Sequence, residues 1–184
     1  TEEDNGQYND SIEVFWATGA CLFIRASHFC EVGGLDEDFF AHQEEIDICW
    51  RLKNKGFSIM VEPRSVVYHI GGGTLNTESP FKTYLNFRNN LYMLFKNLPF
   101  SSLSTIIPIR LILDGIAAVT LLKQENGVQH LLMILKAHFS FYSNIPKLIK
   151  KRKSLTHRKN LTGKVKYSIL IKNKIKRIKV FSNL

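Results

Sequence analysis

The sequence predicts an α/β fold over roughly the first hundred residues, followed by an α-helical, strongly basic segment. Short apolar segments typical of strands alternate with helical patterns up to about residue 98, and two long apolar stretches come after them. The charge also changes sign along the chain. With 45% hydrophobic and 22% charged residues among 184, the chain can form a core, and the composition excludes a disordered, collagen-like or polytopic membrane protein.

The first hundred residues are expected to contain four short strands and three helical segments. The strands are expected at 12–16, 20–24, 57–61 and 66–70. A short helical turn at 27–32 precedes a helix at 42–55, for which Gly56 is a suitable C-cap. The three glycines at 71–73 indicate a turn, and Ser79 followed by Pro80 starts a helix that runs to about Leu98. Further helices are expected at 103–122 and 127–142, before a Lys-rich tail.

The charge distribution divides the chain into two parts. Residues 1–80 hold 14 acidic residues and 5 Lys or Arg, whereas residues 126–184 hold no acidic residue and 15 Lys or Arg. A compact nucleic-acid-binding module would not need the acidic part. We therefore expect a catalytic or binding unit over 1–99 and an attachment segment over 100–184.

The cysteines and the first residues give further expectations. Cys21, Cys30 and Cys49 form no Cys-x-x-Cys pair, so neither a disulfide framework nor a zinc knuckle is expected, and we predict reduced, buried thiols. No signal peptide is expected at the start, because the first residues are acidic where a signal peptide would be basic, and the sequence does not begin with Met. The start is expected to be a cut edge within a longer sequence.

An acidic cluster marks the start of the helix at 42–55. Glu44 and Asp47 lie about 60° apart on a helix of 3.6 residues per turn, and Glu45 sits between turns, so a general base can sit beside a second carboxyl group. Alternatively, these acids only stabilise the positive end of the helix dipole. His69, directly before the glycines, is either a ligand or a structural residue.

Several motifs together resemble a known family. They are ATGA at 17–20, Arg25, GGLDEDFF at 33–40, EEIDICWR at 44–51 and VYHIGG at 67–72. In this order and spacing they resemble the second half of a family 2 glycosyltransferase, most of all the bacterial rhamnosyltransferase-like enzymes that build surface polysaccharide. The resemblance covers about residues 12–98. It implies the C-terminal half of a GT-A type α/β fold, a nucleotide-sugar donor and a saccharide or lipid-linked acceptor.

The resemblance assigns catalytic and metal-binding roles by position. Glu44 and Glu45 match the acidic pair that supplies the catalytic base, with Glu45 at the base position, which is commonly Asp in the family. His69 matches a histidine that completes a divalent metal site, for Mg²⁺ or Mn²⁺. The Asp-x-Asp pattern at 36–38 follows the glycine loop and is not taken as the family's metal motif. The half that carries that motif and the nucleotide-binding strands is absent, so the chain alone is expected to be inactive.

The resemblance also implies substrate-binding residues. Gly19, with Thr18 and Ala20, matches the loop near the donor sugar. Asp47 and Trp50 match positions that support the acceptor pocket.

The second part of the chain is expected to attach to a membrane. Residues 103–122 are apolar enough to span one, but Arg110 and Asp114 lie inside and are costly at the bilayer centre. They are four residues apart and can pair on one helix face. We favour an interfacial or packed helix over a span. For the basic tail we favour an anionic membrane surface over nucleic acid, because no aromatic platform for bases is present.

Together these observations predict an inverting glycosyltransferase fragment, peripheral to the cytoplasmic face of a bacterial inner membrane. Two alternatives remain open: a non-catalytic, membrane-attached remnant or partner subunit, and a basic nucleic-acid-binding protein.

Overall fold

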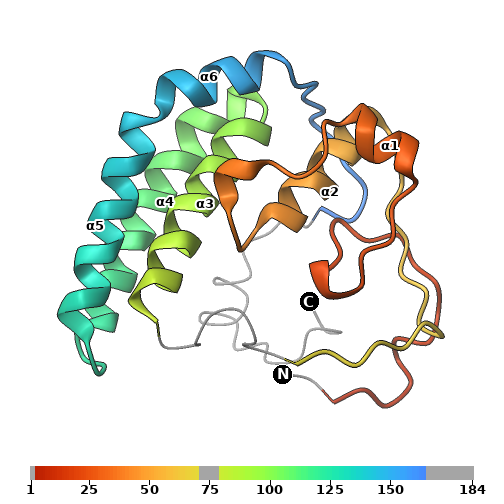
Figure 1. Ribbon diagram of the computed structural model, residues 1–184, viewed down its shortest axis with the longest axis horizontal. Helices are drawn as coiled ribbons and strands as arrows, with labels where there is room; N and C mark the ends of the chain where they lie inside the picture. Colours follow the sequence, from red (N-terminus) through yellow and green to blue (C-terminus); the bar gives the residue numbers. More distant parts are fainter. Residues whose placement is uncertain (1–2, 71–78, 165–184) are drawn as a thin grey trace.

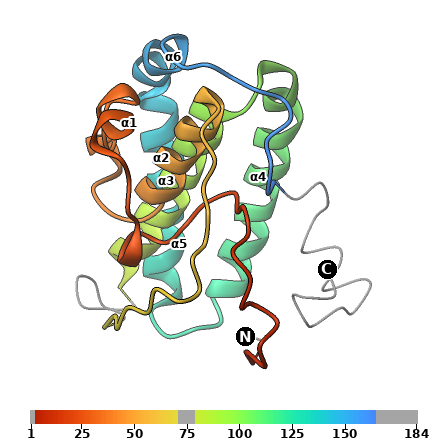
Figure 2. The same ribbon diagram turned by 90° about the vertical axis from the view of Figure 1, so that its right-hand side faces the viewer.

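The computed structural model describes residues 3–70 and 79–164, and the regular structure of these residues is helical (Figure 1). The helices are α1 (Ala26–Glu31), α2 (Glu44–Lys55), α3 (Pro80–Asn97), α4 (Phe100–Leu121), α5 (Gly127–Ser143) and α6 (Ile145–Lys153), with short 3₁₀ turns η1 (Gly19–Cys21) and η2 (Glu37–Phe39). Helices α3, α4 and α5 lie side by side, and α6 crosses one end of this bundle (Figures 1 and 2). Helix α2 packs on α3.

The predicted α/β fold, a GT-A half, is wrong for the described residues, which contain no strand. The segments expected as strands are extended, and a single antiparallel bridge joins Glu13 to Met60. Two backbone hydrogen bonds flank it, from Val14 N to Ile59 O at 2.8 Å and from Val61 N to Ile12 O at 2.9 Å. Strand-forming sequences need paired neighbours to make a sheet, and one bridge between two segments is too little.

Most predicted helices are confirmed. Helix α2 ends at Gly56, whose φ of +103° is the left-handed conformation of a C-cap, and α3 starts at Pro80 directly after Ser79. Helices α4 and α5 lie within a few residues of the ranges expected for them. Helix α6 was not predicted, because its sequence was read as part of the Lys-rich tail; its fully buried Leu148 anchors it to the bundle. The predicted glycine turn at 71–73 lies outside the described residues.

The three cysteines are free thiols, as predicted, but only Cys49 is buried. Cys21 and Cys30 are exposed, which contradicts the expectation for them, because η1 and α1 lie at the surface and contain no buried residue.

The apolar core joins the two parts of the chain. Helix α3 is central, since it packs against α2, α4, α5 and α6. The buried cluster contains residues from both sides of position 100: Phe39, Trp50, Leu91, Tyr92, Met93, Leu98, Phe141 and Leu148.

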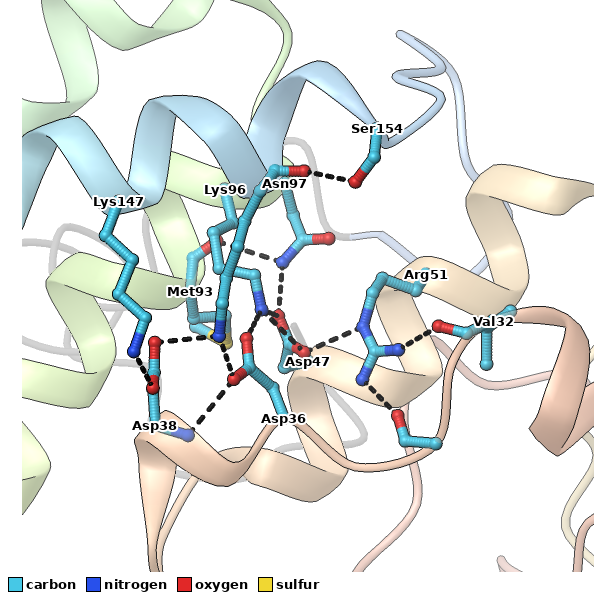
Figure 3. Close-up of polar contacts among 12 residues, drawn as sticks. Val32, Asp36, Asp38, Asp47, Arg51, Met93, Lys96, Asn97, Lys147 and Ser154 are labelled. Atoms are coloured by element: carbon cyan, nitrogen blue, oxygen red, sulfur yellow. Dashed lines mark hydrogen bonds and ion pairs between the residues drawn. The ribbon is translucent and has the colours of Figure 1, made fainter.

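A buried carboxylate lies beside this apolar core (Figure 3). Asp47 of α2 is fully buried and accepts hydrogen bonds from Arg51 Nε at 2.8 Å and from Asn97 Nδ2 at 2.7 Å. The ammonium of Lys96, also buried, lies 3.0 Å from Asp47 Oδ1. Arg51 in turn donates to the carbonyl oxygens of Val32 and Gly34, so this network joins α2, α3 and the loop after α1.

Helix α6 extends the ionic network to the acidic loop (Figure 3). Lys96 also pairs with Asp36, and Lys151 lies 2.5 Å from Asp36 and 2.7 Å from Asp38. Lys147 pairs with Asp38 at 2.5 Å. Burial opposes ionisation of Asp36, but the charge of Lys96 and the hydrogen bonds from Lys151 and Lys96 outweigh it and lower its pKa to about 2.

The ion pair predicted inside the apolar helix α4 is confirmed. Arg110 Nη2 lies 2.6 Å from Asp114 Oδ1, and Asp114 is fully buried. His138 of α5 supplies a second partner for Asp114, at 3.0 Å from its Oδ2. The buried charge of Asp114 is thus paired with Arg110 on its own helix and contacts His138 of α5.

Replacement of Lys96 should strongly destabilise the protein. In Lys96→Met, Asp47 and Asp36 lose a shared cation in a buried setting, so the free energy of unfolding should fall by about 3–5 kcal/mol. Lys55→Met is the matched control, because Lys55 and its partner Glu31 are both exposed and 3.7 Å apart; its cost should be about 0–1 kcal/mol. Urea unfolding measures both. Equal losses for the two variants would contradict the ionic core described here.

Candidate functional site

The predicted acidic pair lies in the first turn of α2. Glu44 and Glu45 are half-buried, and in each side chain Oε2 is shielded from solvent and has no hydrogen-bond partner among the described residues. A buried carboxylate oxygen without a donor is energetically costly. Both oxygens therefore keep an unused capacity to accept a proton or a hydrogen bond.

The surroundings of Glu45 make its carboxylate a stronger base than an ordinary glutamate. Burial raises the pKa of Glu45, and the neighbouring carboxylate of Glu44 raises it further, while hydrogen bonds from the backbone oppose the change. A pKa closer to neutral increases the proton affinity of the carboxylate, which favours general-base catalysis.

The structure brings the predicted sugar-binding loop to this acid. Gly19, at the start of η1, lies so close to Glu45 that a β-carbon on Gly19 would be 3.6 Å from Glu45 Cβ. Thr18 caps the turn, its Oγ1 accepting a hydrogen bond from Ala20 N at 3.4 Å. Gly19, assigned to the donor sugar, and Glu45, assigned to the base, are thus neighbours, although they are 26 residues apart in sequence.

Asp47 and Trp50 take structural positions. Asp47 is enclosed by the ionic core, and Trp50 is 4% exposed, with its ring packed edge-on against Phe15 at 5.2 Å. Trp50 Nε1 is shielded and has no partner among the described residues. Their contact with an acceptor stays a prediction.

His69 is exposed and lies in an irregular segment, one residue before the described range 3–70 ends. Within residues 3–70 and 79–164, no three His, Cys, Asp or Glu side chains lie close enough together to hold a metal ion. The described residues therefore do not fit a divalent cation by themselves, and we derive no catalytic step through one.

The loop before α2 has an unusual backbone. Phe40, His42 and Gln43 have positive φ angles of 61°, 68° and 70°. Residues with a β-carbon rarely adopt this conformation, and each instance costs about 1–3 kcal/mol unless its surroundings impose it. The start of α2, with its two glutamates, follows directly from this loop.

Side chains of α3 impose that conformation. Asn89 is fully buried, and its Nδ2 lies within hydrogen-bond distance of three carbonyl oxygens, at 2.9 Å for Phe39, 2.7 Å for Ala41 and 2.8 Å for His42. Arg88 Nε donates to Asn89 Oδ1 at 2.9 Å and fixes the orientation of the amide. Asn89 thus satisfies the carbonyl groups that the turn leaves without partners.

Gln43 forms a second connection between the loop and α3. Its Nε2 donates to Asn86 O at 3.2 Å, and its Oε1 accepts from Asn90 Nδ2 at 3.2 Å. The backbone oxygen of Gln43 accepts the first helical hydrogen bond of α2, from Asp47 N. Helix α3 therefore sets where α2 begins.

The sequence analysis missed two residues of this site, His42 and Asn89. His42 Nε2 is shielded and has no partner among the described residues, and burial together with the charge of Lys82 lowers the pKa of its ring. A neutral imidazole beside the acidic pair can accept or donate a hydrogen bond. For Asn89, a signal was available: three asparagines within five residues of a helix that is otherwise apolar on that side.

Curated glycosyltransferases are similar to part of the chain. An N-acetylglucosaminyl-diphospho-decaprenol L-rhamnosyltransferase of Mycobacterium tuberculosis is 39% identical over 56 residues, which is 30% of this chain and 18% of the relative. The low-salt glycan biosynthesis hexosyltransferase Agl10 of Haloferax volcanii is 32% identical over 85 residues, covering 46% and 28% of the two chains. Rhamnosyltransferase WbbL of Escherichia coli is 34% identical over 62 residues, covering 34% and 23%.

These similarities support a glycosyltransferase-like relationship for the chain. The chain spans less than a third of the length of these relatives. No family model matches the sequence, and no solved structure matches it.

Loss of Asn89 should loosen the loop before α2. In Asn89→Ala the carbonyl oxygens of the turn lose their shared donor, and the free energy of unfolding should fall by about 2–3 kcal/mol. Asn89→Asp should be at least as destabilising, because it places a carboxylate against carbonyl oxygens.

The matched control is Asn90→Ala, which removes one side-chain hydrogen bond and should cost less than about 1 kcal/mol. Urea unfolding compares the three variants. Wild-type stability for both Asn89 variants would show that the loop does not depend on this amide.

Proposed function

We propose that this chain supplies the acceptor-side part of an inverting glycosyltransferase of the family 2, rhamnosyltransferase-like kind. The reaction would transfer a sugar from a nucleotide-sugar donor to a saccharide or lipid-linked acceptor during surface polysaccharide synthesis. The observation that carries the proposal is the setting of the Glu45 carboxylate. The side chain is half-buried, its pKa is raised, and its Oε2 has no hydrogen-bond partner among the described residues. It also contacts the turn at Gly19.

In the proposed reaction, Glu45 acts as the general base. Its free oxygen accepts the proton of an acceptor hydroxyl as the hydroxyl oxygen attacks the anomeric carbon. The bond between that carbon and the nucleoside diphosphate breaks on the opposite face, and its electron pair leaves with the diphosphate. The configuration at the anomeric carbon inverts, and the proton ends on Glu45.

Similarity to named enzymes supports the substrate class. The Mycobacterium tuberculosis relative is named for a diphospho-decaprenol acceptor, and this supports a lipid-linked acceptor for the proposal.

We propose that donor binding needs residues beyond this chain, so that the chain alone is inactive. We also propose a requirement for Mg²⁺ or Mn²⁺ with His69 as one ligand; an unchanged metal dependence of activity in His69→Ala would remove His69 from that role.

We further propose that the protein docks peripherally on an anionic membrane surface, at the cytoplasmic face of a bacterial inner membrane. Two observations support this. Among the described helices, α4 is long and apolar enough to cross a membrane by length and composition, with a mean hydropathy of 1.6, and it exposes apolar side chains such as Ile112 at 65% and Val119 at 62%. Residues 126–184 carry 15 Lys or Arg and no acidic residue.

Replacement of the proposed base should slow glycosyl transfer. Glu45→Gln keeps the shape of the side chain but removes the proton acceptor, so the rate of transfer by the complete gene product should fall by about 10²–10⁴-fold. Product formation from a panel of nucleotide sugars and lipid-linked acceptors measures the rate, and donor binding should persist.

Glu37→Gln is the matched control, since Glu37 is exposed and lies outside the α2 turn; its rate should stay near wild type. If Glu45→Gln retains near-normal turnover while Glu44→Gln does not, the base is Glu44 and the assignment to Glu45 is wrong.

Vesicle binding tests the membrane proposal. Each Lys or Arg near an anionic surface contributes about 1 kcal/mol, attenuated beyond about 8 Å at physiological salt. The protein should bind vesicles that contain anionic lipid more tightly than neutral vesicles, and salt should weaken binding without abolishing it, because apolar contacts are not screened. Co-sedimentation measures this. Equal binding to both vesicle types would contradict the electrostatic part of the proposal.

A further inference from the structure

An apolar groove lies where α4, α5 and α6 meet, at the end of the bundle that α6 crosses (Figure 1). Its volume is about 830 Å³, within the range of about 300–1,000 Å³ typical of small-molecule sites. Aromatic and aliphatic side chains dominate the lining, and several are strongly exposed: Phe100 at 83%, Tyr142 at 51% and Ile149 at 40%. An apolar hollow with exposed aromatic walls is unfavourable in water and indicates an occupant.

Helix α6 has two basic faces with different surroundings. Lys147 points to the acidic loop and pairs with Asp38 (Figure 3). Lys151, one turn further along, pairs with both Asp36 and Asp38. On the groove side, Ile145, Ile149 and Arg152 recur at helical spacing. The cations of α6 on this side therefore lie next to apolar walls rather than to carboxylates.

Three nitrogen-bearing side chains line one end of the groove: Arg152, Lys153 and His157. Arg152 Nη1 donates to Phe95 O at 2.7 Å, and His157 Nε2 lies 2.7 Å from Lys96 O, so both side chains are held by the end of α3. Within residues 3–70 and 79–164 none of the three forms an ion pair with a carboxylate. Arg152 and Lys153 thus give this end of the groove, its basic rim, a positive charge that no carboxylate of the described residues offsets.

We propose that the groove binds one hydrocarbon chain of a lipid whose head group is a phosphate or diphosphate, with the phosphate at Arg152, Lys153 and His157. An apolar groove that ends at basic groups without carboxylate partners complements an amphiphile with a single anionic head group. The groove also opens beside the exposed apolar side chains of α4, so a chain can enter it sideways from a lipid layer. An acidic peptide helix would complement the rim, but it would not account for the apolar surface that continues along α4.

This inference goes beyond the proposed glycosyl transfer and does not depend on it. The groove residues belong to α4, α5, α6 and the segment that follows, whereas the acidic pair lies at the start of α2. Failure of one proposal leaves the other in place, because lipid binding is measured without turnover.

Binding of decyl phosphate below its micelle-forming concentration tests the proposal on this chain. Titration calorimetry should show saturable binding of decyl phosphate, at least tenfold weaker binding of decyltrimethylammonium, and no binding of inorganic phosphate alone. The first comparison isolates the basic rim and the second isolates the apolar groove.

Two pairs of variants locate the site. Ser104→Trp fills the groove and should weaken decyl phosphate binding at least tenfold, whereas Thr105→Trp, an equally exposed neighbour outside the groove, should leave it unchanged. Lys153→Glu should weaken binding about tenfold, and Lys150→Glu, an exposed lysine of α6 outside the groove, should have less than a twofold effect. Circular dichroism confirms the helical content of each variant.

Three results would overturn the proposal. They are equal effects within either pair of variants, equal affinity for the anionic and cationic amphiphiles, and binding of an acidic amphipathic peptide at the groove without binding of decyl phosphate. The last result would assign the groove to a protein partner.

Discussion

The ion pair between Asp47 and Lys96 is the interaction on which the other parts of the structure depend. Both charges are buried, and each is costly unless the other is present. Because Asp47 belongs to α2 and Lys96 to α3, the pair fixes how these helices pack. Arg51 and Asn97 fill the remaining positions around Asp47, and their other hydrogen bonds reach the loop after α1 and the backbone of α3. A carboxylate that looks like a substrate-binding group in sequence is thus the centre of the packing.

The position of the acidic pair at Glu44 and Glu45 follows from that packing. With α2 packed on α3, the loop before α2 takes left-handed backbone conformations at Phe40, His42 and Gln43, which lack the freedom of glycine. Asn89 offsets this strain by donating to the carbonyl oxygens of the turn. Rigid support of this kind holds Glu45 beside Gly19, and a base must be held in such a way to act on a bound hydroxyl.

The sequence predicted the parts of the structure that depend on local chemistry. Gly56 and Pro80 mark helix ends by backbone conformation, and Arg110 and Asp114 are paired by helical spacing alone. The expected strands failed because β-structure depends on partners: the segments around Glu13 and Met60 meet at one bridge, and the described residues offer no further pairing. The contact between Gly19 and Glu45 was not predicted, because it joins segments far apart in the sequence. Asn89 was missed although three asparagines stand within five residues, because the carbonyl groups to which it donates lie 47 to 50 residues away.

The ion pairs of α6 show that the acidic and basic parts of the chain contact each other within the protein. The acidic first part and the basic last part look like separate units with separate partners, yet Lys147 and Lys151 neutralise Asp36 and Asp38 inside the protein. Lys151 cannot serve a membrane without giving up its half-buried ion pairs with Asp36 and Asp38, which is unfavourable, whereas the pair of the exposed Lys147 costs less to break. The proposed attraction to an anionic surface therefore depends on basic residues outside these pairs. On α6, Arg152 and Lys153 line the exposed apolar groove, so that charge and apolar surface favour the same kind of ligand there.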